Sequence, residues 1–137
     1  MIEMMKNDKF CLWQVLLPLL PLLMILASCR KSAEETADNL RIEKLHQLDE
    51  LLNAQSPQAK AEIEKGMQQA KDSLTFYEYY ARKGRWLCQS ATPDSTVGYV
   101  DRTLRFALRQ PDTPRRNGLL AYTYNCQGIN YHNFHRK

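Results

Sequence analysis

The chain has 137 residues, a formal net charge of +4 and 44% hydrophobic residues. This length suits one small domain rather than a multidomain protein. Abundant Ala, Leu, Glu, Lys, Arg and Gln favour helix over strand. Because the sequence contains no strand-like alternation of useful length and no low-complexity tract, we expect an all-α fold.

The N-terminal segment has the layout of a signal peptide. The first ten residues are polar and carry Lys6 and Lys9, and an apolar run from Cys11 to Ala27 follows, interrupted only by Gln14, Pro18 and Pro21. A membrane-spanning helix needs about 20 apolar residues, and each proline costs roughly 3 kcal/mol inside a helix. We therefore expect this segment to be removed rather than kept as a spanning anchor.

The residues Leu26-Ala27-Ser28-Cys29 resemble the lipobox of bacterial lipoproteins. An ordinary secretory cleavage site would have a small residue where Leu26 stands. The resemblance implies that residues 1–28 are a lipoprotein signal peptide, with Leu26, Ala27 and Ser28 recognised at the cleavage site. Cys29 would then carry a diacylglyceryl group and an acylated amine, and several such chains anchor a protein firmly. The alternatives are an uncleaved signal anchor and plain secretion.

The same resemblance bears on the compartment. Arg30 stands where an aspartate commonly marks retention at the inner membrane, so an outer-membrane lipoprotein of the cell envelope is expected, and residues 29–39 form its lipidated N-terminus and tether. The acidic pair Glu34-Glu35 resembles, faintly, the tags of surface-exposed lipoproteins. Export also removes the chain from the chromosome, so the membrane is an expected partner and nucleic acid is not.

Helix breaks in the remaining region are predicted by three dipeptides, Ser56-Pro57, Thr92-Pro93 and Thr113-Pro114. In each, the hydroxyl residue can cap a helix whose first position accepts proline. Four helical segments follow, at about 34–53, 57–90, 93–109 and 114 to the end. The first has a face of Ile42, Leu45, Leu48 and Leu52.

The second segment carries small or apolar residues at an unbroken spacing of four and three, and we expect one long helix that pairs with the first segment as an antiparallel hairpin. Its stripe consists of Ile63, Met67, Ala70, Leu74, Tyr77, Ala81, Gly84 and Cys88. A dimeric coiled coil is the alternative.

The third segment has an apolar side and a basic side. The apolar side consists of Val97, Val100, Leu104, Ala107 and Leu108, and the basic side of Arg102, Arg105 and Arg109. From residue 82 onward the chain holds ten Lys or Arg against three Asp or Glu. Such asymmetry indicates an anionic surface or partner, so these three arginines are candidate anion-binding residues. A solvated basic face is the alternative.

The pattern Tyr124-x2-Gln127-Gly128-x2-Tyr131 resembles the first helix of a tetratricopeptide repeat. In that family Tyr124, Gly128 and Tyr131 would be packing residues, with the glycine admitting a neighbouring helix. Residues 77–107 resemble a degenerate repeat with Gly84 in the glycine role. Gln127 departs from the family's leucine.

By this resemblance, residues 40–137 look like the N-terminal portion of exported Gram-negative tetratricopeptide-repeat proteins, whose longer members serve as sensors. The implied fold is a set of antiparallel helical hairpins, incomplete at the C-terminus because the sequence stops where the next helix would start. An ordinary four-helix domain is the alternative.

No residue pattern for catalysis stands out. The sequence has no phosphate loop, nucleophile elbow or paired-cysteine metal signature, and Cys126 with His132 and His135 lacks a further ligand pair. Cys88 and Cys126 are either a disulfide or two separate thiols. We expect a non-catalytic scaffold that binds an unidentified protein and uses no metal or cofactor. An anion-binding surface lipoprotein and a gene fragment without function of its own are the alternatives.

Overall fold

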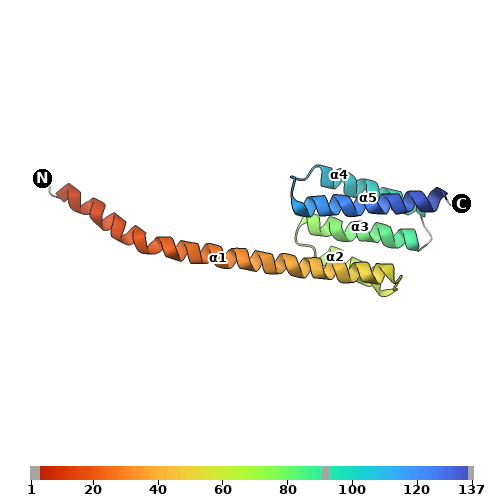
Figure 1. Ribbon diagram of the computed structural model, residues 1–137, viewed down its shortest axis with the longest axis horizontal. Coiled ribbons are helices and arrows are strands. Elements are labelled where there is room, and N and C mark those ends of the chain that lie inside the picture. The colour runs from red at the N-terminus through yellow and green to blue at the C-terminus, as the bar shows by residue number, and fades with distance from the viewer. Residues whose placement is uncertain (1–3, 91–92, 136–137) are drawn as a thin grey trace. The chain divides into compact units, whose positions relative to one another are not determined.

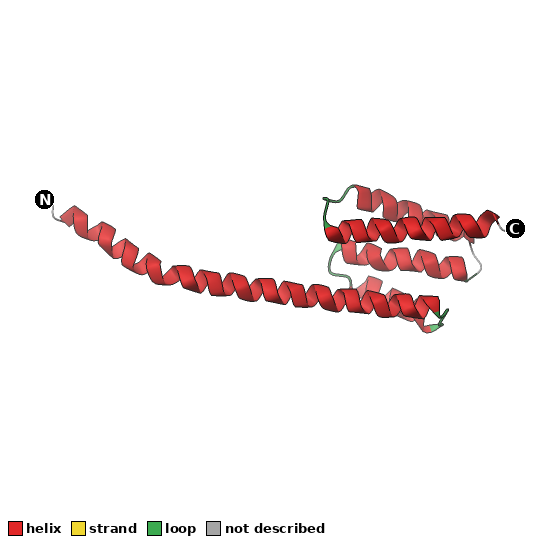
Figure 2. Ribbon diagram, in the orientation of Figure 1, coloured by secondary structure: helices red, strands yellow, loops and turns green. Residues whose placement is uncertain are grey.

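The computed structural model describes residues 4–90 and 93–135, with side chains described for residues 19–90 and 96–132. The described residues form five helices and no strand (Figures 1 and 2). The helices are α1 (Met4–Asn53), α2 (Gln58–Gln69), α3 (Ser73–Gln89), α4 (Pro93–Leu108) and α5 (Pro114–His135). The prediction of an all-α, repeat-like fold built from antiparallel hairpins is confirmed.

The chain divides into two units, residues 1–43 and residues 44–137. Within the first unit α1 begins at Met4, earlier than the predicted start near Glu34, and continues through Pro18 and Pro21. From residue 19 to residue 26 its large apolar side chains are exposed, by 45% at Leu19 and up to 71% at Met24. Within the described residues, no helix combines the length and apolar character needed to cross a membrane.

The second unit opens with a hairpin between the end of α1 and α2. Its core contains Leu45, Leu48 and Leu52 from α1 with Ala59 and Ile63 from α2, and Tyr79 of α3 closes it. The predicted face of the first segment is therefore confirmed at these three leucines. Ile42, predicted on the same face, is exposed.

The turn after α1 is a Schellman-type helix end. The amide of Ser56 donates to the carbonyl of Leu51, 2.9 Å away, and Gln55 adopts a left-handed φ of 50°. The Ser56 hydroxyl then accepts a hydrogen bond from the Gln58 amide at 3.3 Å. The predicted break at Ser56-Pro57 is confirmed. The turn lowers stability at Gln55, whose backbone adopts a conformation that favours glycine.

The predicted single helix over residues 57–90 is wrong, because it breaks between α2 and α3. Ala70 turns to extended backbone, and the Asp72 carboxylate caps α3 by accepting a 2.8 Å hydrogen bond from the Thr75 amide. The apolar stripe remains buried or half-buried, but α2 and α3 fold back on each other. They pack so closely that a Cβ on Gly66 would lie 2.2 Å from the Tyr79 ring.

Helix α4 packs on α3 with a face rotated from the predicted one. Its buried residues are Thr96, Val100, Thr103 and Ala107, whereas Val97 and Leu108 are exposed. The Thr103 hydroxyl donates to the Tyr99 carbonyl one turn back, at 2.8 Å. Because this hydrogen bond satisfies the threonine hydroxyl, the residue can be buried, although the sequence pattern treated threonine as a polar, exposed residue. Thr92, the predicted cap of this helix, lies outside the described residues.

Helix α5 begins as predicted, with the Thr113 hydroxyl accepting a 3.2 Å hydrogen bond from the Arg116 amide. Its buried residues are Leu119, Thr123, Cys126 and Asn130. Consecutive helices of the second unit run antiparallel, so α3 and α5 run parallel, with α4 packed against both (Figure 1).

An ion pair links three of these helices. Arg82 of α3, only 7% exposed, donates to both carboxylate oxygens of Asp49 on α1, at 3.0 and 2.6 Å. Its third nitrogen donates to the Glu78 carbonyl at 2.9 Å. On α5, the Tyr122 ring lies 4.3 Å from the guanidinium, and its hydroxyl donates to Asp49 at 3.2 Å. Burial raises the pKa of Tyr122, so this hydroxyl keeps its proton.

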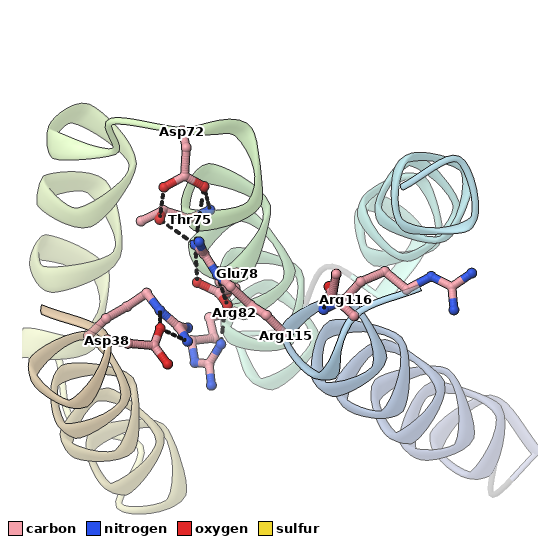
Figure 3. Close-up of polar contacts among 9 residues, drawn as sticks. Asp38, Asp72, Thr75, Glu78, Arg82, Arg115 and Arg116 are labelled. Atoms are coloured by element: carbon pink, nitrogen blue, oxygen red, sulfur yellow. Dashed lines mark hydrogen bonds and ion pairs between the residues drawn. The ribbon is translucent and has the colours of Figure 1, made fainter. Parts of the chain in front are cut away.

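A second arginine joins the starts of α3 and α5. Arg115 contacts the buried carboxylate of Glu78 at 3.2 Å and Asp72 at 3.1 Å, and it also donates to the Thr75 hydroxyl (Figure 3). Partial burial raises the pKa of Asp72, but the hydrogen bonds from Thr75 and the charge of Arg115 outweigh it and hold that pKa below its ordinary value.

We expect Gln55→Gly to stabilise the protein by about 0.5–1 kcal/mol, because glycine adopts positive φ without a Cβ penalty. Gln55→Val should destabilise it, since a β-branched residue fits this conformation poorly. Urea unfolding followed by circular dichroism measures both changes. Loss of stability in the glycine variant would contradict the left-handed turn.

We expect Arg82→Ala to destabilise the protein by about 3 kcal/mol, because it leaves the Asp49 carboxylate without its bidentate partner. Combined with Asp49→Ala, the loss should fall short of the sum of the single losses by about 1 kcal/mol or more. The control is the exposed α4 pair Arg105 and Asp101, whose removal should cost under about 1 kcal/mol. Additive losses at Arg82 and Asp49 would show that the pair is not coupled.

Candidate functional site

The predicted lipidation residues lie on α1 in the first unit. Leu26, Ala27, Ser28 and Cys29 are consecutive and all exposed, and Cys29 is a thiol. These residues are helical, and the two small side chains before the cysteine are exposed. The predicted cleavage before Cys29 and its lipidation stay predictions.

The three candidate anion-binding arginines are exposed, with Arg102 and Arg105 on α4 and Arg109 directly after it, but two of them already have partners. Arg102 donates to the Tyr80 hydroxyl at 3.3 Å, and Arg105 pairs with Asp101 on the next turn. Other basic residues of the C-terminal half point inward, as Arg82 and Arg115 do. The excess positive charge therefore does not form one continuous free surface, and anion binding at Arg102, Arg105 and Arg109 stays a prediction.

The residues of the tetratricopeptide-like pattern lie together on one side of α5. Tyr124 is 51% exposed and Tyr131 is 68% exposed. A Cβ built on Gly128 would meet no heavy atom within 4 Å among the described residues. The predicted close approach of another helix to Gly128 is therefore not made by the part of the chain that the structure describes.

The corresponding close approach is made on α3. A Cβ on Gly84 would lie 2.7 Å from the Cβ of Tyr99 on α4. The rings of Tyr80 and Tyr99 lie 4.5 Å apart, and those of Tyr77 and Phe106 stack at 3.9 Å. Gly84 thus admits α4, and two aromatic pairs fill the space beside it. The glycine role predicted for Gly84 agrees with this geometry.

Helix α5 repeats the pattern of α3 at a distance of 44 residues, where Tyr80 and Gly84 correspond to Tyr124 and Gly128. The inward residues Tyr79 and Arg82 correspond to Thr123 and Cys126, which are also buried. The face that receives α4 corresponds to Ala121, Tyr124, Asn125 and Gly128, all of which are exposed. We name these four residues the open face of α5.

The sequence resemblance already assigned Gly84 and Gly128 the same glycine role. Sequence reasoning missed that α3 is a separate helix, because helical spacing continues across Ala70, where the chain breaks. As separate helices, α3 with 17 residues and α5 with 22 residues can be compared position by position.

The cysteines and histidines do not form an additional site in the described residues. Cys88 and Cys126 line the same small cavity of about 60 Å³, and burial raises the pKa of Cys126 to about 11. His132 is exposed, and the side chain of His135 lies outside the described part of the chain. Within that part, no three His, Cys, Asp or Glu side chains gather as metal ligands would.

A shallow groove of about 350 Å³ lies between the end of α1, α2 and Tyr79 of α3. Glutamine side chains and the charged residues Lys44, Glu62 and Lys65 line it. The sequence pattern did not indicate this groove, because it mixes polar residues of α1 and α2 with Leu48 and Leu51 of the hairpin core. It contains neither a buried charge nor a nucleophile.

Comparison with protein families, with curated proteins and with solved structures finds no match to this chain. The function of the protein is therefore inferred from the residues of the chain itself. Among these, the open face of α5 is the surface with the most specific geometry.

We expect alanine to have opposite effects at the two corresponding glycines. Gly128→Ala should stabilise the protein by about 0.5–1 kcal/mol, since alanine is the better helix former and the site is open. Gly84→Ala should destabilise it by about 1–2 kcal/mol, because a Cβ there forces α4 away. Chemical unfolding of both variants measures the difference. Equal effects at the two positions would contradict the assignment of a covered and an open glycine.

Proposed function

We propose that this chain is a membrane-anchored lipoprotein that acts as a non-catalytic scaffold and binds another protein through α5. The observation that carries the proposal is the open face, where the Tyr124 side chain and the Gly128 backbone are exposed at positions that correspond to covered positions of α3. Exposed apolar patches on an otherwise packed domain commonly mark protein interaction sites. The tetratricopeptide-like pattern supports the same reading, since such repeats bind proteins.

The anchor is supported by the lipobox-like residues before Cys29 and by the apolar side chains of residues 19–26. These side chains are exposed, and leaving them in water costs about 25 cal/mol per Å² of apolar surface. Removal by cleavage, with lipid on Cys29 in their place, resolves this cost. Arg30 after the cysteine supports the outer membrane of the cell envelope as the location, with the membrane as the first partner of the chain.

A non-catalytic role is supported by what the polar residues do. The most buried charged groups, Arg82 with Asp49 and Arg115 with Glu78, join helices to one another. Such ion pairs hold helices in register, so these four side chains serve packing. The proposed scaffold role therefore requires neither a cofactor nor a metal ion.

We expect Cys29→Ser to abolish incorporation of labelled fatty acid and to leave the precursor unprocessed, because the serine hydroxyl is not the thiol that receives the diacylglyceryl group. Gel mobility and acyl labelling in the bacterial host measure both. Cys88→Ser is the matched control and should change neither. Equal labelling and processing in the Cys29 variant would remove the lipoprotein proposal.

The scaffold role has its own measurement in the same cells. A photo-crosslinking residue at position 124 should trap a protein in the membrane fraction, and Cys29→Ser should shift that protein away from the membrane. If the trapped protein has the same distribution between membrane and soluble fractions in both strains, then α5 binds it but the anchor does not determine its location. Absence of any crosslink at 124, with efficient crosslinking at the opposite side of the domain, would contradict binding through α5.

A further inference from the structure

The helix that packs on Gly84 of α3 indicates which kind of surface can pack on Gly128 of α5. On α3, the cover is an antiparallel helix, α4, which places the Cβ of Tyr99 against Gly84 and the Tyr99 ring beside the Tyr80 ring. Seven residues later, Phe106 stacks on Tyr77. One register therefore describes both ring contacts: two aromatic side chains seven residues apart on α4 lie against one face of α3.

The open face of α5 keeps the parts of α3 that this register needs. Tyr124 and Gly128 stand where Tyr80 and Gly84 stand on α3, so a facing helix can approach the glycine closely and lay a ring against the tyrosine. Asn125 replaces Ala81. Ala121 replaces Tyr77 and leaves space for a large side chain.

We propose, building on the proposed scaffold function, that the open face of α5 binds an antiparallel amphipathic helix of a partner protein. This partner helix places an aromatic side chain opposite Gly128 and a second large apolar side chain seven residues after the first, opposite Ala121. Recognition of a helix by a helix face is a recurring mode of peptide binding. The glycine sets the specificity, because only close backbone approach brings the ring onto Tyr124.

The α4 sequence itself is the probe for this register. A fluorescent peptide of residues 93–109 contains Tyr99 and Phe106 at the required spacing of seven. It should bind the full chain in detergent micelles, with fluorescence anisotropy as the measurement. A peptide with Tyr99→Ala should bind about tenfold more weakly or worse, since the ring that lies against Tyr124 is lost.

Two variants of the chain test the position of binding. Gly128→Leu should weaken peptide binding about tenfold or more, because the added side chain fills the space of the facing helix. Gly98→Leu on α4 is the matched control, since Gly98 is also exposed with no atom within 4 Å among the described residues, and it should leave binding unchanged. Circular dichroism of both variants checks that each remains folded.

Three results would overturn the inference. Peptide binding that is insensitive to Gly128→Leu would mean that the peptide replaces the native α4 or attaches elsewhere. No binding at about 1 mM peptide would remove helix recognition in this register. A dimer in analytical ultracentrifugation that Gly128→Leu dissociates would make a second copy of the chain the occupant. Each of these results leaves the scaffold proposal intact if position 124 still crosslinks a membrane-recruited protein.

Discussion

The Arg82 guanidinium is the group on which the arrangement of the second unit depends. It satisfies the Asp49 carboxylate of α1 through two hydrogen bonds, and the Tyr122 ring of α5 covers its face. A buried charge of this kind is tolerated only with full pairing, so α1, α3 and α5 must meet at one place. Because Tyr122 faces Arg82, Thr123 and Cys126 turn inward, and the side of α5 with Tyr124 and Gly128 turns outward.

Arg115 provides the second constraint, at the other end of the same two helices. It holds the start of α5 against Glu78 and the cap residue Asp72 of α3 (Figure 3). Two anchoring points on a pair of parallel helices fix both rotation and register, which a single contact cannot do. The correspondence of α3 with α5 therefore follows from ion pairs as much as from apolar packing. The pairs are specific because guanidinium and carboxylate match geometrically.

The sequence predicted those features that depend on neighbouring residues. Ser56-Pro57 and Thr113-Pro114 marked two helix starts because a hydroxyl cap and a proline act locally. The break at Ala70 escaped prediction because Met67, Ala70 and Leu74 keep helical spacing across it, although Asp72 followed by Thr75 is itself a capping signal. The buried roles of Arg82 and Arg115 escaped as well. Their partners Asp49 and Glu78 lie more than 30 residues away in sequence, and charge pattern alone favours exposure for any arginine.

The composition of the open face suits reversible contact better than permanent packing. On α3 the face beneath α4 carries Tyr77 and Ala81, and it is buried within the folded chain. On α5 the same positions carry Ala121 and Asn125, so less apolar surface is exposed and the asparagine amide is hydrated when the face is empty. Burial of less apolar area gives weaker attraction, while the glycine and the tyrosine still define one register. A face built in this way can be soluble when empty and still select the helix that covers it.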